Sequence, residues 1–197
     1  MATFGYTSKG GHGLELFADD AGESVGTPAG GNGTVSKISV YPAGSSAYYL
    51  KGVIWLESTK AIITNGVGGT VLDGSSAWLD MNYTTSPTVV NGTNYYVGVV
   101  TSGNIVLYCD TGFPAGSGGQ DGDNSYATPK TFGTLINNTL KPSIYATYTA
   151  AASGKLPQVN IGDVWKQTTA VQINIGDVWK TVTHAQINIG DTWKTIF

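Results

Sequence analysis

A nine-residue segment that occurs three times near the end of the chain constrains the fold more than any other feature. The first copy reads Gln-Val-Asn-Ile-Gly-Asp-Val-Trp-Lys from Gln158, and the copies from Gln172 and Gln186 each follow 14 residues later. Each copy has two short β-prone arms around a Gly-Asp pair, and glycine readily takes the positive φ that a tight hairpin turn requires. Each copy is therefore predicted to form a β-hairpin, with its turn at Gly162-Asp163, Gly176-Asp177 or Gly190-Asp191.

The hairpin pattern leaves apolar side chains on both faces of each ribbon. In a two-residue hairpin, Ile161 lies opposite Val164 and Asn160 lies opposite Trp165. The 40 residues from 158 to 197 are close to the minimum that folds without disulfides, metal or partners. We expect the repeats to pack against other copies of the chain or against the first domain, and a small self-contained sheet is the alternative. The expected assembly residues recur at the same positions of the copies: Trp165, Trp179, Trp193, Ile161, Ile175 and Ile189.

The rest of the chain consists of short β-prone segments between turn signals. Apolar and polar residues alternate over 48–57 and 77–83, and Asn65-Gly66 and Asn91-Gly92 are typical turn pairs. Many short strands at regular spacing predict an antiparallel β-sandwich or jelly roll. The sequence therefore predicts an all-β chain with a sandwich domain over 1–150, a linker over 151–157 and three 14-residue β-repeats over 158–197.

Composition argues against several classes of partner. The chain has a net charge of −3, and its ten basic residues are all lysine, so the arginine forks that favour nucleic-acid recognition are missing. No apolar run is long enough for a membrane helix. The first residues lack the apolar core of a secretory signal, so we expect synthesis in a cytosol. Cys109 is predicted to be a buried strand residue and not a nucleophile.

The residues needed for catalysis are scarce. The two histidines, His12 and His184, lie in a glycine-rich turn and in a connector between repeats, and no nucleophile elbow, Walker loop or zinc-protease motif occurs. The carboxylates could form a glycosidase pair, but they are most simply solvated surface groups. The chain is therefore predicted not to be an enzyme and to need no cofactor.

Asp121 and Asp123 are candidate calcium ligands, because they place several oxygen atoms on one loop. They are weak candidates, because such a loop is equally typical of ordinary turns.

Several aromatic residues are predicted to lie on the outward faces of strands. Alternation places Trp55, Trp78, Tyr49 and Tyr41 there, and flat exposed rings can stack on sugars or lie in a protein interface. The alternative is that a second sheet and loops cover these faces. Trp55, Trp78 and Tyr49 are the candidate glycan-binding residues.

The repeated unit Val/Ile-Asn-Ile-Gly-Asp-Val/Thr-Trp-Lys resembles the short tryptophan-lysine repeats at the ends of bacteriophage virion and tail proteins. The first domain, including segments 78–83 and 92–99, resembles small β-sandwich modules of phage tail and fibre proteins, which are similar to carbohydrate-binding modules. The resemblance implies a virion structural protein (short tail fibre, tail accessory or capsid decoration) that is made in the host cytoplasm. Its expected partners are its own copies, as a homotrimer, and other virion proteins, but no nucleic acid or membrane. The alternative is a carbohydrate-binding protein that adsorbs to host glycan.

Overall fold

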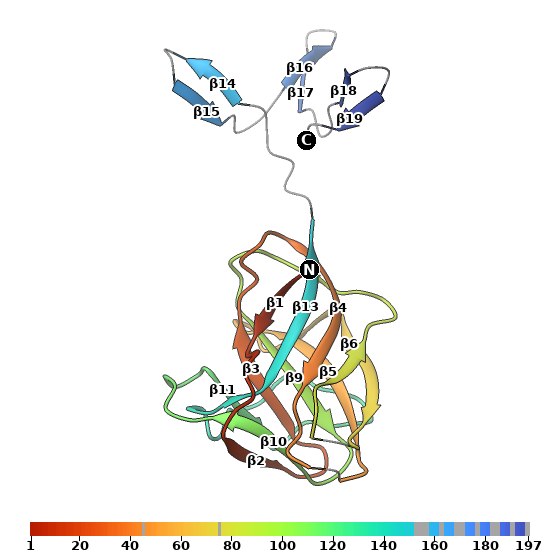
Figure 1. Cartoon of the computed structure of the whole chain (residues 1–197), viewed down its shortest axis with the longest axis vertical. Helices are drawn as coiled ribbons and strands as arrows, with labels where there is room; N and C mark the ends of the chain where they lie inside the picture. The colour runs from red at the N-terminus through yellow and green to blue at the C-terminus, as the bar shows by residue number, and fades with distance from the viewer. Residues whose placement is uncertain are drawn as a thin grey trace. The chain divides into compact units, whose positions relative to one another are not determined.

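The computed structural model describes residues 1–44, 46–74 and 76–151, together with the backbone of six short strands beyond them (Figure 1). Every regular element of the described residues is a β-strand, and none is a helix that could cross a bilayer. Contacts divide the chain into two units, 1–151 and 152–197. The strands of the first unit are β1 (Ala2–Gly5), β2 (His12–Leu16), β3 (Ala21–Gly26), β4 (Gly33–Val40), β5 (Tyr49–Leu56), β6 (Ile62–Leu72), β7 (Leu79–Asn82), β8 (Thr88–Val89), β9 (Tyr95–Thr101), β10 (Ile105–Asp110), β11 (Gly118–Asp121), β12 (Lys141–Pro142) and β13 (Ile144–Ala150).

The first unit is built from three antiparallel sheets. The β13 sheet has the order β1-β13-β4-β7, with β8 also paired to β4, and the β9 sheet has the order β11-β3-β9-β5-β6. Figure 1 shows β1, β13 and β4 side by side in front of β9 and β5. A third, smaller β10 sheet has the order β12-β10-β2. The predicted all-β, antiparallel sandwich class is confirmed.

The main core lies between the β13 and β9 sheets, where the inward residues of both alternate with outward ones. Ile38 and Ile144 from the β13 sheet and Leu50 and Val97 from the β9 sheet belong to one buried cluster. Gly52 of β5 lies so close to Ile38 that an added Cβ would be 3.1 Å from its Cδ1 atom. The sheets are therefore packed to near contact, as protein interiors require.

A second, smaller core covers the outer face of the β9 sheet. Trp55 and Tyr96 are buried there beneath Phe132, which comes from the long segment between β11 and β12. Phe132 stacks on Tyr96 at a centroid distance of 5.0 Å and meets Trp55 edge-on at 5.5 Å. The Trp55 Nε1 atom donates a hydrogen bond to the Lys130 carbonyl at 2.8 Å. Part of the face that alternation places outward is thus covered by an irregular segment.

The repeat region forms three hairpins, each a separate two-stranded sheet. In the first hairpin Ile161 pairs with Val164 and Asn160 pairs with Trp165, which is the register that the sequence predicts. Among the strands that the structure describes, none of these six pairs outside its own hairpin. The predicted turn pairs, and the side chains of the predicted assembly residues, lie outside the described residues. The strands are β14 (Gln158–Ile161), β15 (Val164–Gln167), β16 (Gln172–Ile175), β17 (Val178–Thr181), β18 (Gln186–Ile189) and β19 (Thr192–Thr195).

Candidate functional site

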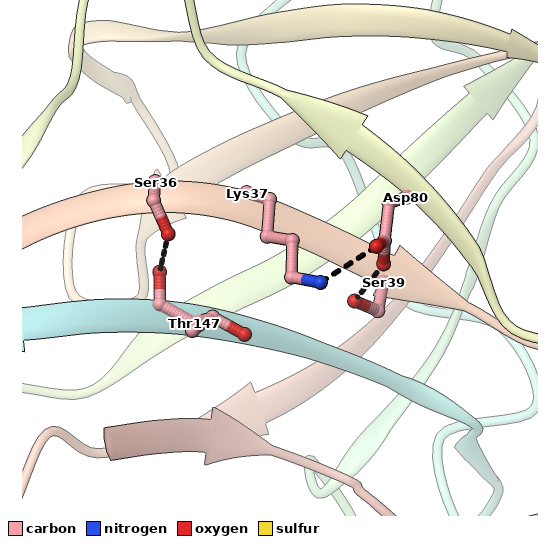
Figure 2. A network of polar contacts seen from close by, with 5 residues as sticks. All are labelled: Ser36, Lys37, Ser39, Asp80 and Thr147. Carbon is pink, nitrogen blue, oxygen red and sulfur yellow. Dashed lines mark hydrogen bonds and ion pairs between the residues drawn. The ribbon is translucent and has the colours of Figure 1, made fainter. Parts of the chain in front are cut away.

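A row of polar side chains crosses the outer face of the β13 sheet. Figure 2 shows Lys37 and Ser39, both on β4, reaching the carboxylate of Asp80 on β7. The Lys37 Nζ and Ser39 Oγ atoms each donate to Asp80 at 2.6 Å, and the same figure shows Ser36 Oγ donating to the Thr147 carbonyl at 3.2 Å. Burial raises the pKa of Asp80, but the hydrogen bonds from Lys37 and Ser39 outweigh it, so the pKa is lowered overall. Asp80 is therefore an ionised acceptor that remains 42% exposed.

Four half-buried aromatic rings adjoin this row, and we call them the aromatic patch: Trp78, Tyr41, Tyr108 and Tyr145. Trp78, just before β7, meets Tyr41 at a centroid distance of 5.3 Å and Tyr145 at 4.8 Å, both edge-on. Tyr41 meets Tyr108 edge-on at 5.4 Å. Tyr145 pairs across the ladder with Ser39, and Ser39 pairs with Asp80. The patch thus offers apolar ring surface beside a charged acceptor.

Backbone hydrogen bonds between the β10 and β13 sheets bring these rings together. The Tyr41 N–H donates to the Ser143 carbonyl at 3.0 Å, and the Ser143 N–H donates to the Tyr108 carbonyl at 2.8 Å. The Tyr108 N–H in turn donates to the Tyr41 carbonyl at 3.0 Å. The end of β4, the strand β10 and the start of β13 are therefore joined at one point, and each contributes a ring there.

Lys9 lies over two rings of the patch. Its Nζ atom is 4.4 Å from the Tyr108 centroid and 5.3 Å from the Tyr41 centroid, within the range of a cation–π interaction. The next residue, Gly10, fits so tightly that an added Cβ would lie 2.2 Å from the carbonyl atoms of Cys109. Its N–H donates to Ser143 Oγ at 2.9 Å. A glycine at position 10 therefore lets the loop approach β10 closely enough to hold Lys9 over the patch.

A second cluster, the Tyr6 cluster, extends this surface: Tyr6, Phe113, Asp110 and Lys141. Tyr6 and Phe113 meet edge-on at 5.6 Å, and the Lys141 Nζ atom lies 5.6 and 5.4 Å from their respective centroids. Asp110 lies two residues after Tyr108 on β10 and therefore on the same strand face. Its carboxylate accepts hydrogen bonds from the Tyr6 hydroxyl and from the Gly11 N–H. These bonds lower the pKa of Asp110, and the bond to Asp110 raises that of Tyr6.

The structure brings one of the three predicted glycan-binding residues to the patch. Trp78 belongs to it, whereas Tyr49, 50% exposed, lies on β5 in the other sheet. Trp55 lies on the outer face of its sheet, as the alternation predicts, but it is 0% exposed beneath Phe132, so the alternative that loops cover this face is confirmed there and Trp55 is not open to a glycan. Tyr145 was not among the candidate residues, although it alternates with buried Ile144 and Ala146 on β13. That alternation is the sequence pattern from which an outward-facing Tyr145 could have been predicted.

The acidic loop after β11 does not resemble a calcium site. The Asp121 carboxylate accepts hydrogen bonds from the Gly133 N–H at 2.8 Å, the Asn124 Nδ2 at 3.2 Å and the Asp123 N–H at 3.2 Å. Such donors occupy the lone pairs that a cation would need. The described residues hold no group of three or more His, Cys, Asp or Glu side chains that could bind a metal ion. Asp121 instead stabilises the segment that covers the second core.

The expectation that the carboxylates are solvated is wrong for Glu23. It lies in β3 and is 0% exposed, and neither oxygen has a hydrogen-bond partner. Burial, and secondarily the nearby charge of Asp121, raises the pKa of Glu23 well above its ordinary value. Glu23 shares its strand face with Ala21 and Val25, which pack in the second core. We therefore relate its burial to the stability of the fold and not to binding at the aromatic patch.

Comparison with known proteins does not assign this chain to a family. No protein-family model matches this sequence, and no curated protein is significantly similar to it. The features that bear on function are thus the chain's own: three hairpins whose described strands form separate two-stranded sheets, and a sandwich surface that combines the aromatic patch with lysines and carboxylates.

Proposed function

We propose that the protein is a structural component of a bacteriophage particle: a short tail fibre, a tail accessory or a capsid decoration. Its repeats join copies of the chain, as a homotrimer, and its sandwich domain recognises a surface. Its action is binding and assembly, without catalysis. The observation that carries this proposal is that each repeat forms a separate two-stranded sheet of four-residue strands.

A single hairpin of this size has little stability of its own in water. Two-stranded hairpins are at best marginally stable, and three or more strands or another packed element are needed. Unpaired strand edges also present N–H and C=O groups that pair readily with another chain. Three hairpins at a constant spacing of 14 residues would give three equivalent contacts between copies, and closed symmetric oligomers satisfy such contacts.

Mass measurement by light scattering tests the assembly role. The full chain is expected to be a trimer, and a chain ending at Lys155 is expected to be a folded monomer. Replacing Trp165, Trp179 and Trp193 together by alanine should also give a monomer, because these residues recur at one position opposite asparagine. A matched control replaces the following lysines by glutamine and should keep the trimer: Lys166, Lys180 and Lys194. A monomeric full chain, or a tryptophan variant of unchanged mass, would show the proposal to be wrong.

The aromatic patch favours a second candidate, binding of host glycan. Half-exposed rings beside the ionised Asp80 and the donor Lys37 match what a sugar offers, namely an apolar ring face and hydroxyl groups at its edge. Trp78→Ala should abolish binding on a glycan array. Tyr49→Ala removes an exposed ring from the other sheet and should leave binding unchanged. Equal effects of both variants, or no binding to any glycan, would refute this candidate.

A further inference from the structure

We propose that the ligand of the aromatic patch is an acidic polysaccharide, with its sugar rings on Trp78 and Tyr41 and its carboxylates paired with Lys9 and Lys141. This inference rests on the glycan-binding candidate above and adds the chemical class of the glycan. Its basis is the distribution of charge partners around the patch.

Within the described part of the chain, neither Lys9 nor Lys141 has an acidic partner. Among the described residues the only ion pair joins Lys37 to Asp80, so neither of the two lysines has a carboxylate within 4 Å. The acid that shares their surface, Asp110, already accepts hydrogen bonds from the Tyr6 hydroxyl and the Gly11 N–H. Both ammonium groups instead lie over aromatic pairs. They are thus two positioned cations on a chain whose net charge is −3.

Lys141 also lines an open groove whose other lining residues are partly polar and partly apolar, the latter including Phe4 and Val25. The groove has a volume of about 540 Å³, within the range of small-molecule sites. Its polar lining residues are Thr3, Thr27, Ser117 and Asn94. The Thr27 hydroxyl donates to Asn94 Oδ1 at 2.5 Å, which fixes one of these walls. A ligand that reaches from the aromatic patch past Lys141 would therefore meet hydroxyl and amide partners.

A ligand that matches the aromatic patch and its lysines must supply both hydrogen-bond donors and hydrogen-bond acceptors. Asp80 already accepts from Lys37 and Ser39 but stays 42% exposed, so it has room for a further donor, whereas Lys9 and Lys141 need anionic acceptors. A polyuronate carries hydroxyl donors, carboxylate acceptors and apolar ring faces on the same unit. An acidic peptide supplies carboxylate acceptors and backbone N–H donors, but its acidic residues carry no apolar ring face to lie on Trp78. Nucleic acid is a poorer match because the chain contains no arginine to recognise phosphate in a bidentate manner.

Titration calorimetry of the full-length protein with polygalacturonate and with the neutral polymer dextran tests the inference. The double variant Lys9→Gln/Lys141→Gln should bind polygalacturonate about tenfold more weakly at low salt. Added NaCl should likewise lower the affinity of the unmodified protein for polygalacturonate. The matched control Lys51→Gln/Lys130→Gln removes the same charge from elsewhere in the sandwich domain. Lys51 also lies over a ring, 4.4 Å from the Tyr126 centroid. This control should bind as the unmodified protein does.

The outcomes separate the two proposals. Equal binding of dextran and polygalacturonate, with no effect of the double variant, would overturn the acidic class and leave glycan binding standing. Failure to bind any glycan on the array would refute glycan binding itself. Tighter binding of polyglutamate than of polygalacturonate, with the same loss in the double variant, would identify an acidic protein as the partner and overturn the inference.

Discussion

Glu23→Met should stabilise the protein, although it removes an ionisable residue from the middle of a strand. Both carboxyl oxygens of Glu23 are buried and have no hydrogen-bond partner, and a buried unsatisfied polar group costs about 1–3 kcal/mol. Methionine has a similar length and no group that needs a partner. A gain of about 2 kcal/mol in the free energy of unfolding corresponds to a rise in melting temperature of about 4–8 °C for a chain of this size.

The gain should depend on pH in a defined direction. The pKa of Glu23 is raised in the folded state, so between the ordinary carboxyl pKa and the raised one the folded state holds a proton that the unfolded state has released. The unfolded state then binds fewer protons, and the free energy of unfolding falls as pH rises through this window. Asp121, whose charge adds to the shift, opposes ionisation of Glu23. The advantage of Glu23→Met should therefore be larger at pH 8 than at pH 4.

Urea denaturation of the full chain at several pH values measures both effects. The control Glu15→Met replaces an exposed strand glutamate and should change the free energy of unfolding by less than about 0.5 kcal/mol. The reasoning is refuted if Glu23→Met destabilises the protein at every pH. It is equally refuted if the difference between this variant and the unmodified protein does not grow as pH rises.

Three further predictions concern buried contacts of the sandwich domain. Trp55→Phe removes the hydrogen bond to the Lys130 carbonyl and should lower the free energy of unfolding by about 1–3 kcal/mol in urea titration. Gly26→Ala places a Cβ 2.2 Å from the Gly5 nitrogen, so circular dichroism melting should show a loss of about 1–3 kcal/mol or more. Cys109 is fully buried, and burial raises the pKa of its thiol. It should react with a disulfide reagent only after unfolding, and rapid reaction of the native protein would contradict this.

The all-β class was predictable because its signals are local. The alternation over 48–57 correctly places Leu50 and Ile54 on one face, which packs in the main core, and Val53 and Trp55 on the other. The repeat defines the hairpin register because a Gly-Asp pair leaves only one two-residue connection between its arms. These features depend on residues close together in sequence.

The position of Trp55 was not predictable, because alternation assigns a face without showing what covers it. The cover comes from Phe132 in an irregular segment 77 residues further along the chain. The same limit applies to Glu23, whose burial depends on that segment and on its place between β9 and β11. The aromatic patch likewise joins residues from β10, β13 and the segments that follow β4 and precede β7. Only the fold brings such distant residues together.

The proposed assembly and the proposed binding surface would reinforce each other physically. The aromatic patch is open and half-exposed, and its lysines are screened by solvent, so one copy would bind a sugar segment weakly. A polysaccharide repeats the same chemical group along its length. When copies are joined, the second and third contacts become intramolecular, and avidity can exceed single-site affinity by about 10²–10⁴ without any new contact. Weak single sites and a dedicated joining region are therefore compatible, because the repeats would supply through multiplicity what each sandwich domain lacks in affinity.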